Sequence, residues 1–281
     1  MLFQEYSENK TGMTMLEKIR SLIRPLKAEE PYIDETWDTP FEKLREKWGE
    51  VPDSRKGRNT TKALLDLSAE ELISSWKDSR RDMTSDTQFY HRGWYHTLYK
   101  DVLCGKKVLD VGCGLGIDGV TFAENGAQVT FVDIVEDNLE IVRRVCKKLG
   151  IKNASFLLMQ DIDSLKPLDK DYDTIMAMGS LHHAPEKVVR EEVQELLKHL
   201  KQSGRWLQLA YPKYRWIRDG RKTFDKWGEI TDGIGTPWAE WYDLTKLLKL
   251  MEPARFNVVL CREFHEREFV WFDLMYKGNE S

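Results

Sequence analysis

Three glycines stand at alternate positions directly after a run of β-branched and apolar residues. The stretch VLDVGCGLGIDG, from Val108 to Gly119, places them at Gly112, Gly114 and Gly116. Glycine can adopt a positive φ, and it leaves free the space that a side chain would otherwise fill beside a strand end. The stretch therefore predicts a turn in which the backbone comes close to a bound nucleotide-like ligand.

The position of the third glycine separates two classes of ligand. The dinucleotide fingerprint G-x-G-x-x-G would need glycine at position 117, which Ile117 occupies. The observed pattern is G-x-G-x-G after an acid, Asp110. An NAD-dependent dehydrogenase is therefore a rival at the level of the fold and not the favoured interpretation.

The stretch VLDVGCGLG resembles the first motif of class I S-adenosylmethionine-dependent methyltransferases, and further motifs follow in that family's strand order over roughly residues 88–276. The resemblance implies that Asp110 lies near the amino group of the methionine moiety. It places Asp133, in VTFVDI, on both ribose hydroxyls, since a carboxylate can accept two hydrogen bonds at once. The first 85 or so residues have no counterpart in the family.

The later motifs extend the implied cofactor site. In MQDID the resemblance places Asp161 on the adenine amino group and Ile162 against the ring, with Asp163 as an alternative partner for the amino group. The predicted cofactor-binding residues are Asp110, Gly112, Cys113, Gly114, Gly116, Asp133, Ile134, Asp161, Ile162, Met178 and Gly179. The cofactor is expected to be S-adenosyl-L-methionine, with S-adenosyl-L-homocysteine as the product.

Two adjacent histidines follow the fourth strand in YDTIMAMGSLHHAP. Histidine has the right pKa to take a proton from a hydroxyl or amine near neutral pH, so His182 or His183 is a candidate catalytic base. Adjacent side chains of an extended segment point to opposite sides, so at most one ring is expected to face the cleft. The alternative interpretation is a structural role for both, and their spacing argues against a shared metal.

The acceptor is expected to lie under an insertion after the fifth strand, at about residues 211–242. This segment interleaves lysines and arginines with aromatic residues, which suits a lid over an acceptor that carries a carboxylate or phosphate. The alternative interpretation of this segment is a solvated basic surface loop. A second aromatic cluster, FYHRGWYHTLYK, could line the pocket, and the alternative for it is packing in the core. The predicted acceptor-binding residues are Tyr90, His91, Trp94, Tyr95, Tyr211, Arg215 and Trp216.

Alternating strand and helix patterns must position these residues. Strands are predicted at 107–111, 128–133, 155–160, 172–178 and 205–210, and helices at 117–124, 136–149 and 185–201. Asp243 caps a further helix, and two closing runs form an antiparallel hairpin at the sheet edge. The predicted fold is α/β: a Rossmann-like, doubly wound, seven-stranded sheet, mostly parallel, with an antiparallel last strand.

The leader, residues 1–85, reads as an appendage packed on the main domain, residues 86–281. It is expected to be irregular, with a short helix over Phe41–Trp48 and a second helix that begins at a capping box of Ser68 and Glu71.

The amino-acid composition limits the classes of molecule that the protein is expected to bind. A net charge of −4 offers no general attraction to nucleic acid or anionic lipid. The four cysteines have no zinc-ligand spacing, and no segment is apolar enough to span a membrane, which suits a reduced, cytoplasmic setting. The expected function is methyl transfer to oxygen or nitrogen of a small molecule, which is anionic or sugar-containing in one interpretation. Methylation of RNA or protein and non-catalytic cofactor binding stay open, as does the oligomeric state.

Overall fold

A computed structural model of the chain describes residues 41–53, 57–84 and 92–279. These residues all belong to one compact unit, Asp34–Ser281. The predicted acceptor residues Tyr90 and His91 lie outside the described residues. None of the helices in the described ranges has the length and apolarity that a membrane crossing requires.

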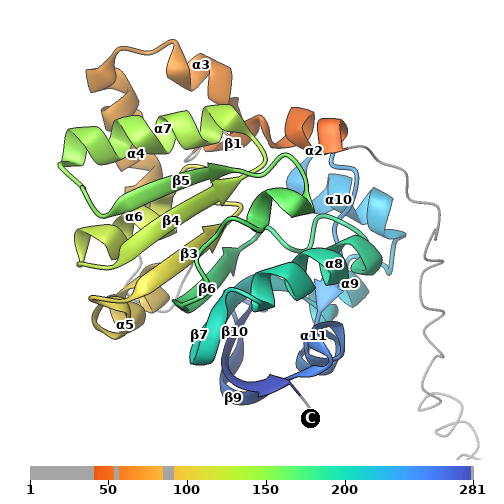
Figure 1. Ribbon diagram of the computed structural model, residues 1–281. Helices are drawn as coiled ribbons and strands as arrows, with labels where there is room; N and C mark the ends of the chain where they lie inside the picture. Colours follow the sequence, from red (N-terminus) through yellow and green to blue (C-terminus); the bar gives the residue numbers. More distant parts are fainter. Residues whose placement is uncertain (1–40, 54–56, 85–91, 280–281) are drawn as a thin grey trace, which may run out of the picture. The chain divides into compact units, whose positions relative to one another are not determined.

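A sheet of eight strands runs through this unit (Figure 1). Its order is β5-β4-β3-β6-β7-β10-β9, and β8 pairs with the end of β7. The first five strands in this order are parallel, whereas β10 is antiparallel to both of its neighbours. The strands are β3 (Lys107–Val111), β4 (Gln128–Asp133), β5 (Ala154–Leu158), β6 (Tyr172–Met178), β7 (Leu200–Pro212), β8 (Trp241–Tyr242), β9 (Ala254–Phe264) and β10 (Phe269–Asn279).

The chain reverses its direction of travel across the sheet between β3 and β6. From β3 it passes to β4 and β5 on one side, and it then returns to β6 and β7 on the other. The connecting loops therefore diverge at the carboxyl ends of β3 and β6. In open α/β sheets this is the place where a ligand crevice forms.

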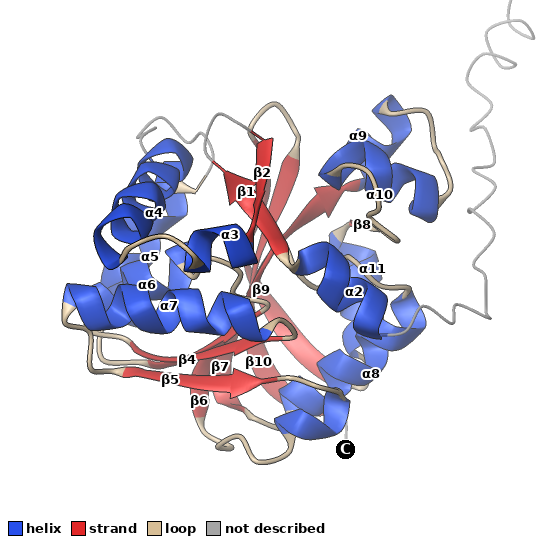
Figure 2. Cartoon of the chain, turned by 90° about the horizontal axis from the view of Figure 1, so that it is seen from above, coloured by secondary structure: helices blue, strands red, loops and turns tan. Residues whose placement is uncertain are grey.

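Helices cover both faces of the sheet because successive side chains of a buried strand point to opposite sides. In β6, Ile175 and Ala177 join one hydrophobic core, and Met176 and Met178 join the other. The Met176 face packs on α5, α6 and α7, and the Ile175 face packs on α8 and α11 (Figure 2). These helices are α5 (Gly93–Leu103), α6 (Ile117–Glu124), α7 (Glu136–Leu149), α8 (Glu186–Leu197) and α11 (Leu244–Met251).

The predicted α/β class, its mostly parallel sheet and its closing hairpin are confirmed. The bounds of β3, β4, β6, α6 and α7 are those predicted. The predicted helix to position 201 is wrong: α8 ends at Leu197, and β7 already begins at Leu200. The reason is that Leu200 pairs with Tyr172, which draws the chain into the sheet before Gly204.

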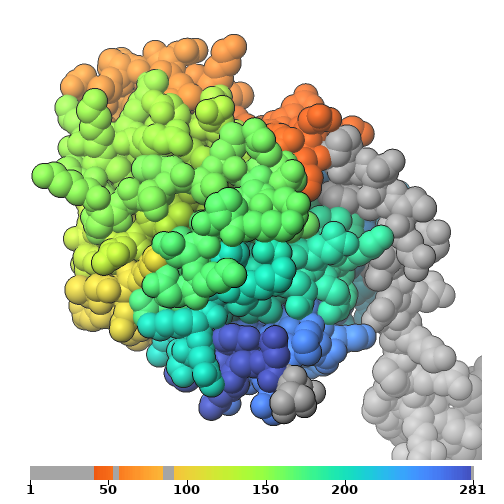
Figure 3. Space-filling view, viewed as in Figure 1, coloured from red at the N-terminus to blue at the C-terminus, as the bar shows by residue number. Residues whose placement is uncertain are grey.

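The described leader contains more regular structure than its sequence suggests. It forms α2 (Phe41–Trp48), a hairpin of β1 (Glu50–Asp53) and β2 (Gly57–Thr60), α3 (Thr61–Leu65) and α4 (Ala69–Thr84). The predicted capping box is present, since Ser68 Oγ accepts from Glu71 N and Glu71 Oε2 accepts from Ser68 N. In Figure 3 the orange-red surface of α2 adjoins the green middle of the chain, where Arg45 Nη1 donates to the carbonyl of Gln160 at 3.2 Å.

The leader also forms a hydrogen bond to the glycine loop. Trp76, on α4, is almost fully buried in the core that α5, α6 and α7 share. Its Nε1–H donates to the carbonyl oxygen of Leu115 at 2.8 Å. The described leader therefore contributes to the main core and holds one residue of the loop in place.

The insertion after β7 folds around a small core of its own. It contains α9 (Lys213–Arg218), α10 (Phe224–Asp232) and β8. The members of this core are Tyr211, Trp216, Phe224, Trp227, Trp238, Ala239 and Trp241. Buried aromatic side chains therefore give the insertion a fixed shape, which brings the end of α10 back to the sheet edge.

We predict that Trp76→Phe lowers the free energy of unfolding by about 1–3 kcal/mol. The phenyl ring retains most of the packing, but the Leu115 carbonyl loses its donor in a buried setting. Urea denaturation followed by circular dichroism measures the change. A stability equal to that of the unsubstituted protein would show that this hydrogen bond does not support the loop.

Candidate functional site

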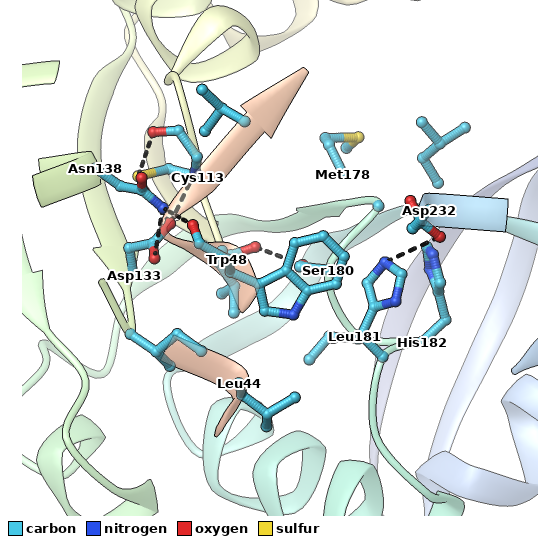
Figure 4. A pocket seen from close by; sticks show the side chains of 18 of the residues that line it. Leu44, Trp48, Cys113, Asp133, Asn138, Met178, Ser180, Leu181, His182 and Asp232 are labelled. Carbon is cyan, nitrogen blue, oxygen red and sulfur yellow. Dashed lines mark hydrogen bonds and ion pairs between the residues drawn. The ribbon is translucent and has the colours of Figure 1, made fainter. Parts of the chain in front are cut away.

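A pocket of about 360 Å³ lies at the carboxyl ends of β3, β4 and β6. The glycine loop and Asp133 line one part of it, and His182 and His183 line another. Trp48, from the end of α2, lies between these two groups, and Asp232, from the end of α10, approaches the histidines (Figure 4). Four segments that are distant in sequence therefore build one site: the leader, the glycine loop, the loop after β6 and the insertion.

The three glycines of the loop serve different purposes. All three have positive φ, so each favours glycine on conformational grounds. A Cβ on Gly112 would lie 2.4 Å from the Cβ of Ser180, and one on Gly116 would lie 2.7 Å from Val142 Cγ2. A Cβ on Gly114 would meet nothing within 4 Å. The expectation that all three keep space for a ligand is therefore corrected: two permit close packing within the protein, and Gly114 faces open space.

Asp133 ends β4 with its carboxylate turned into the glycine loop. Its Oδ2 accepts from Gly114 N at 2.8 Å, and its Oδ1 accepts from Val135 N at 2.9 Å and from Asn138 Nδ2 at 3.1 Å. Burial raises the pKa of this carboxyl above its usual value, although these donors favour the ionised form. The Cys113 thiol, 3.8 Å from Oδ2, is its weakest donor.

Asn138 connects the Asp133 carboxylate to the leader. Its Nδ2 donates both to Asp133 and to the main-chain carbonyl of Trp48, the latter at 3.3 Å. Its Oδ1 is buried at the pocket wall and has no hydrogen-bond partner among the described residues. An acceptor left free beside a carboxylate suits a ligand hydroxyl.

Asp110 lies beneath the loop and is not among the residues that line the pocket. It accepts from the main-chain N–H of Gly119, and burial raises the pKa of its carboxyl well above the usual range. At the wall itself stands an ion pair of Arg92 and Asp118, to which Tyr95 also donates at 2.8 Å. Burial opposes ionisation of Asp118, but Arg92 and its other partners hold its pKa at about 2.

Both histidines face the pocket, so the expectation that only one would do so is wrong. Residues 181–184 form a turn instead of an extended segment, and the two rings lie side by side with centroids 4.1 Å apart. Burial lowers the pKa of both imidazoles, that of His182 the more strongly. Neither ring nitrogen of His182 has a partner in the described structure, whereas His183 Nδ1 lies 3.0 Å from the carbonyl oxygen of Trp238.

Several predicted site residues lie away from the pocket lining. Trp94 and Tyr95 pack against Trp271 in the core. Asp161 is exposed and caps the short helix η1 (Ile162–Leu165), where it accepts from Ser164 N. Cys113, Gly112, Gly114, Asp133, Ile134, Met178, Gly179, His182, His183 and Tyr211 do line the pocket.

The basic residues of the insertion are also placed outside the pocket lining. Arg215 lies over the ring of Tyr211, 4.3 Å from its centroid, and pairs with Glu268 at 3.0 Å. Trp216 is buried in the small core of the insertion. The cations named for an anionic acceptor are thus engaged with the protein's own groups.

Many of the residues that line the pocket were not predicted from the sequence, among them Trp48, Arg58, Asn138, Glu192 and Asp232. Asn138 carried a usable signal, because it falls in the first turn of the helix that follows Asp133. Trp48, Arg58 and Asp232 depend on how the leader and the insertion fold, which no local pattern encodes, and Glu192 depends on how α8 packs on the sheet. Within the described part of the chain, no three His, Cys, Asp or Glu side chains are grouped as metal ligands would be.

Comparison with known sequences identifies the middle of the chain. Residues 108–204 match the family described as "Methyltransferase domain". A Ubiquinone biosynthesis O-methyltransferase of Vibrio parahaemolyticus serotype O3:K6 is 34% identical over 118 residues, which cover 42% of this chain and 50% of that protein. A protein of the same name from Bordetella parapertussis is 35% identical over 106 residues, covering 37% and 42%. The chain therefore spans about half the length of the curated relatives it matches, or less.

Solved structures share the fold at low sequence identity. A 1,6-didemethyltoxoflavin-N1-methyltransferase of Burkholderia thailandensis, with bound 1,6-didemethyltoxoflavin and S-adenosylhomocysteine, has a TM-score of 0.50 and 20% identity, covering 78% of this chain and 89% of that one. A SAM-dependent methyltransferase from Aquifex aeolicus has a TM-score of 0.51 and 16% identity, covering 75% and 99%. Both likenesses extend well beyond the residues that match the sequence family.

We predict that Glu192→Gln stabilises the protein at pH 8 but not at pH 4. Burial raises the pKa of Glu192 to about 7, above the 4.5 that is usual for a glutamate. A raised carboxyl pKa costs stability as the pH rises from about 4.5 through 7, because the folded state must then ionise a buried acid. The variant should gain about 1–3 kcal/mol at pH 8.

Urea titrations of both proteins at pH 4 and pH 8 measure this difference. The exposed Glu191, the preceding residue of α8, provides the matched control, since Glu191→Gln should change stability little at either pH. A gain for Glu192→Gln that is the same at both pH values would contradict the assignment of a buried, neutral carboxyl.

Proposed function

This chain belongs to the class I S-adenosylmethionine-dependent methyltransferases, and from that premise we propose that it methylates an oxygen atom of a small, largely apolar molecule. The observation that carries the proposal is one continuous pocket that joins the Gly114 and Asp133 corner to the two histidines. The relatives named O-methyltransferase support oxygen as the acceptor atom.

The residues present fit S-adenosylmethionine as the cofactor. Gly114 leaves room for a ligand beside the loop, and the free Oδ1 of Asn138 offers an acceptor to a ribose hydroxyl. A second hydroxyl can take the place of the weakly bound Cys113 thiol at Asp133 Oδ2. Apolar side chains of Ile134, Met159 and Leu181 line the same pocket and suit the faces of an adenine ring.

The protein's task is alignment, exclusion of water and disposal of one proton. When bound, the cofactor supplies a methyl group already activated by its sulfonium. Trp48 lies in the same pocket, between the Asp133 corner and the histidines (Figure 4). The acceptor must therefore approach along the histidine side, where a group that removes its proton accelerates the transfer.

His183 is the stronger candidate for that base. Its Nδ1 faces the carbonyl of Trp238, which can only accept, so the proton of the neutral ring lies on Nδ1 and the lone pair lies on Nε2. This fixes both the tautomer and the orientation of the ring, as a general base requires. His182 has no such partner, and its stronger burial disfavours the protonated form.

The proposed acceptor is largely apolar and carries no strong negative charge. At the histidine end the pocket is lined by Tyr211, whose ring centroid lies 4.4 Å from that of His182, and by Phe269, which packs against Tyr211. Arg58 lines the pocket, but its Nε lies 2.9 Å from Glu50 Oε1, so the guanidinium is already paired within the protein. The two anions Glu50 and Asp232 further oppose a carboxylate or phosphate at this end.

We predict that Asp133→Ala weakens binding of S-adenosylhomocysteine by a factor of about 10–100. The variant removes a charged acceptor of ribose hydroxyls, worth about 1.5–3 kcal/mol. Isothermal titration calorimetry measures the affinity, with exposed Glu136→Ala as the control for loss of charge nearby. Near-normal affinity in Asp133→Ala would count against this cofactor site.

We predict that His183→Ala reduces methyl transfer about 100-fold or more, whereas His182→Ala reduces it less, because general-base catalysis contributes about 10²–10⁴-fold. The assay uses cofactor with a labelled methyl group and a fractionated cell extract, followed by identification of the labelled product. Both variants should still bind S-adenosylhomocysteine. Equal, mild losses would leave catalysis to alignment alone, and absence of any labelled product would refute the proposed function.

A further inference from the structure

The insertion brings one carboxylate to the histidine end of the pocket. Asp232, the last residue of α10, lies beside His183, with 4.0 Å between Asp232 Oδ2 and His183 Nε2. Both carboxylate oxygens accept from the hydroxyl of Tyr211, at 3.0 and 2.9 Å. Asp232 lies outside the residues that match the methyltransferase family, so its position depends on the insertion.

Two hydrogen-bond acceptors face each other across this gap. His183 Nδ1 donates to the Trp238 carbonyl, and its Nε2 therefore presents a lone pair toward a carboxylate oxygen. Neither atom can donate to the other, so the pair lacks one proton. A proton arriving on Nε2 would convert this contact into an imidazolium–carboxylate ion pair in a buried setting, where such pairing is strong.

We propose that Asp232 is a positioning residue. It stabilises His183 in the protonated form after the ring has taken the proton that the methyl acceptor releases. The inference rests on the proposed methyl transfer. In that reaction a bond forms between the acceptor oxygen and the methyl carbon, and the bond from that carbon to the cofactor sulfur breaks and leaves a neutral thioether. The O–H bond of the acceptor breaks as well, and its proton moves to His183 Nε2. The positive charge of the sulfonium is thereby replaced by that of an imidazolium beside Asp232.

The surroundings of His183 leave Asp232 as the anion that favours this charge. Arg58, on β2, lies 3.9 Å from Asp232 Oδ1, and both Arg58 and Lys47 disfavour protonation of His183. Lys47 is held by Glu50 and by the main-chain carbonyls of Asp232 and Ile234. His182, Trp48 and Tyr211 add ring contacts without formal charge. Glu50 pairs with both cations, and Asp232 is the anion that favours protonation of the buried ring.

The arrangement also gives the insertion a chemical role. Tyr211, at the end of β7, orients the carboxylate, and Lys47 holds the main chain at the end of α10. The leader and the insertion thus both determine where Asp232 lies. Proteins with the same domain but without these two segments would need another way to stabilise the protonated base.

Nuclear magnetic resonance titration of isotopically labelled histidines tests the inference without a known acceptor. The full chain is saturated with S-adenosylhomocysteine, and the signals of His183 are assigned from their loss in His183→Gln. Asp232→Asn should lower the pKa of His183 by about one unit, because an opposite charge within about 4–6 Å favours the charged ring. The neutral ring should carry its proton on Nδ1.

Two further variants make the result specific. Asp225→Asn removes an exposed charge from the same helix and should leave the pKa of His183 unchanged. Tyr211→Phe removes the hydroxyl that donates to the Asp232 carboxylate, so it should raise the pKa of His183. This shift can still be measured if Asp232→Asn does not fold.

An unchanged pKa in folded Asp232→Asn, no upward shift in Tyr211→Phe, or a proton on Nε2 in the neutral ring would overturn the inference. Failure of the proposed function would look different, as loss of S-adenosylhomocysteine binding or of methyl transfer in the unsubstituted protein.

Discussion

The buried carboxylate of Asp133 joins the parts of the site that the chain keeps far apart. It accepts main-chain N–H groups from the glycine loop and from the start of α7, and through Asn138 it is linked to the carbonyl of Trp48. Burying such an acid is unfavourable unless each oxygen finds donors, so loop, helix and leader must all be in place for it to be satisfied. The shape of the pocket around Gly114 and Asp133 follows from this single requirement.

The acceptor end is organised by a different principle. At that end two buried hydrogen-bond acceptors, His183 Nε2 and the Asp232 carboxylate, face each other. One added proton would turn them into an ion pair. The residues that match the family supply both Asp133 and the two histidines, the leader contacts both ends through Trp48, and the insertion adds Asp232 at the histidine end. The residues that match the family end at 204, within β7, and the insertion that carries Asp232 follows Pro212, outside that match.

Sequence patterns predicted those features of the fold that depend on neighbouring residues. The bounds of β3, β4 and α7 followed from apolar runs and caps, and the position of the third glycine disfavoured a dinucleotide site. The orientation of His182 and His183 was predicted wrongly because a turn was taken for extended chain. Trp48 and Asp232 were missed because their place at the pocket depends on tertiary packing of the leader and the insertion, which carries no periodic signal. The lid arginines were assigned to an acceptor, whereas Arg215 pairs with Glu268.

A crystal structure of the protein with S-adenosylhomocysteine would test the central claim most directly. The account predicts ribose oxygens within hydrogen-bond distance of Asp133 and Asn138, with the sulfur directed toward the His183 side of Trp48. Nucleoside density elsewhere on the protein, or a ribose bound without contact to either side chain, would contradict it.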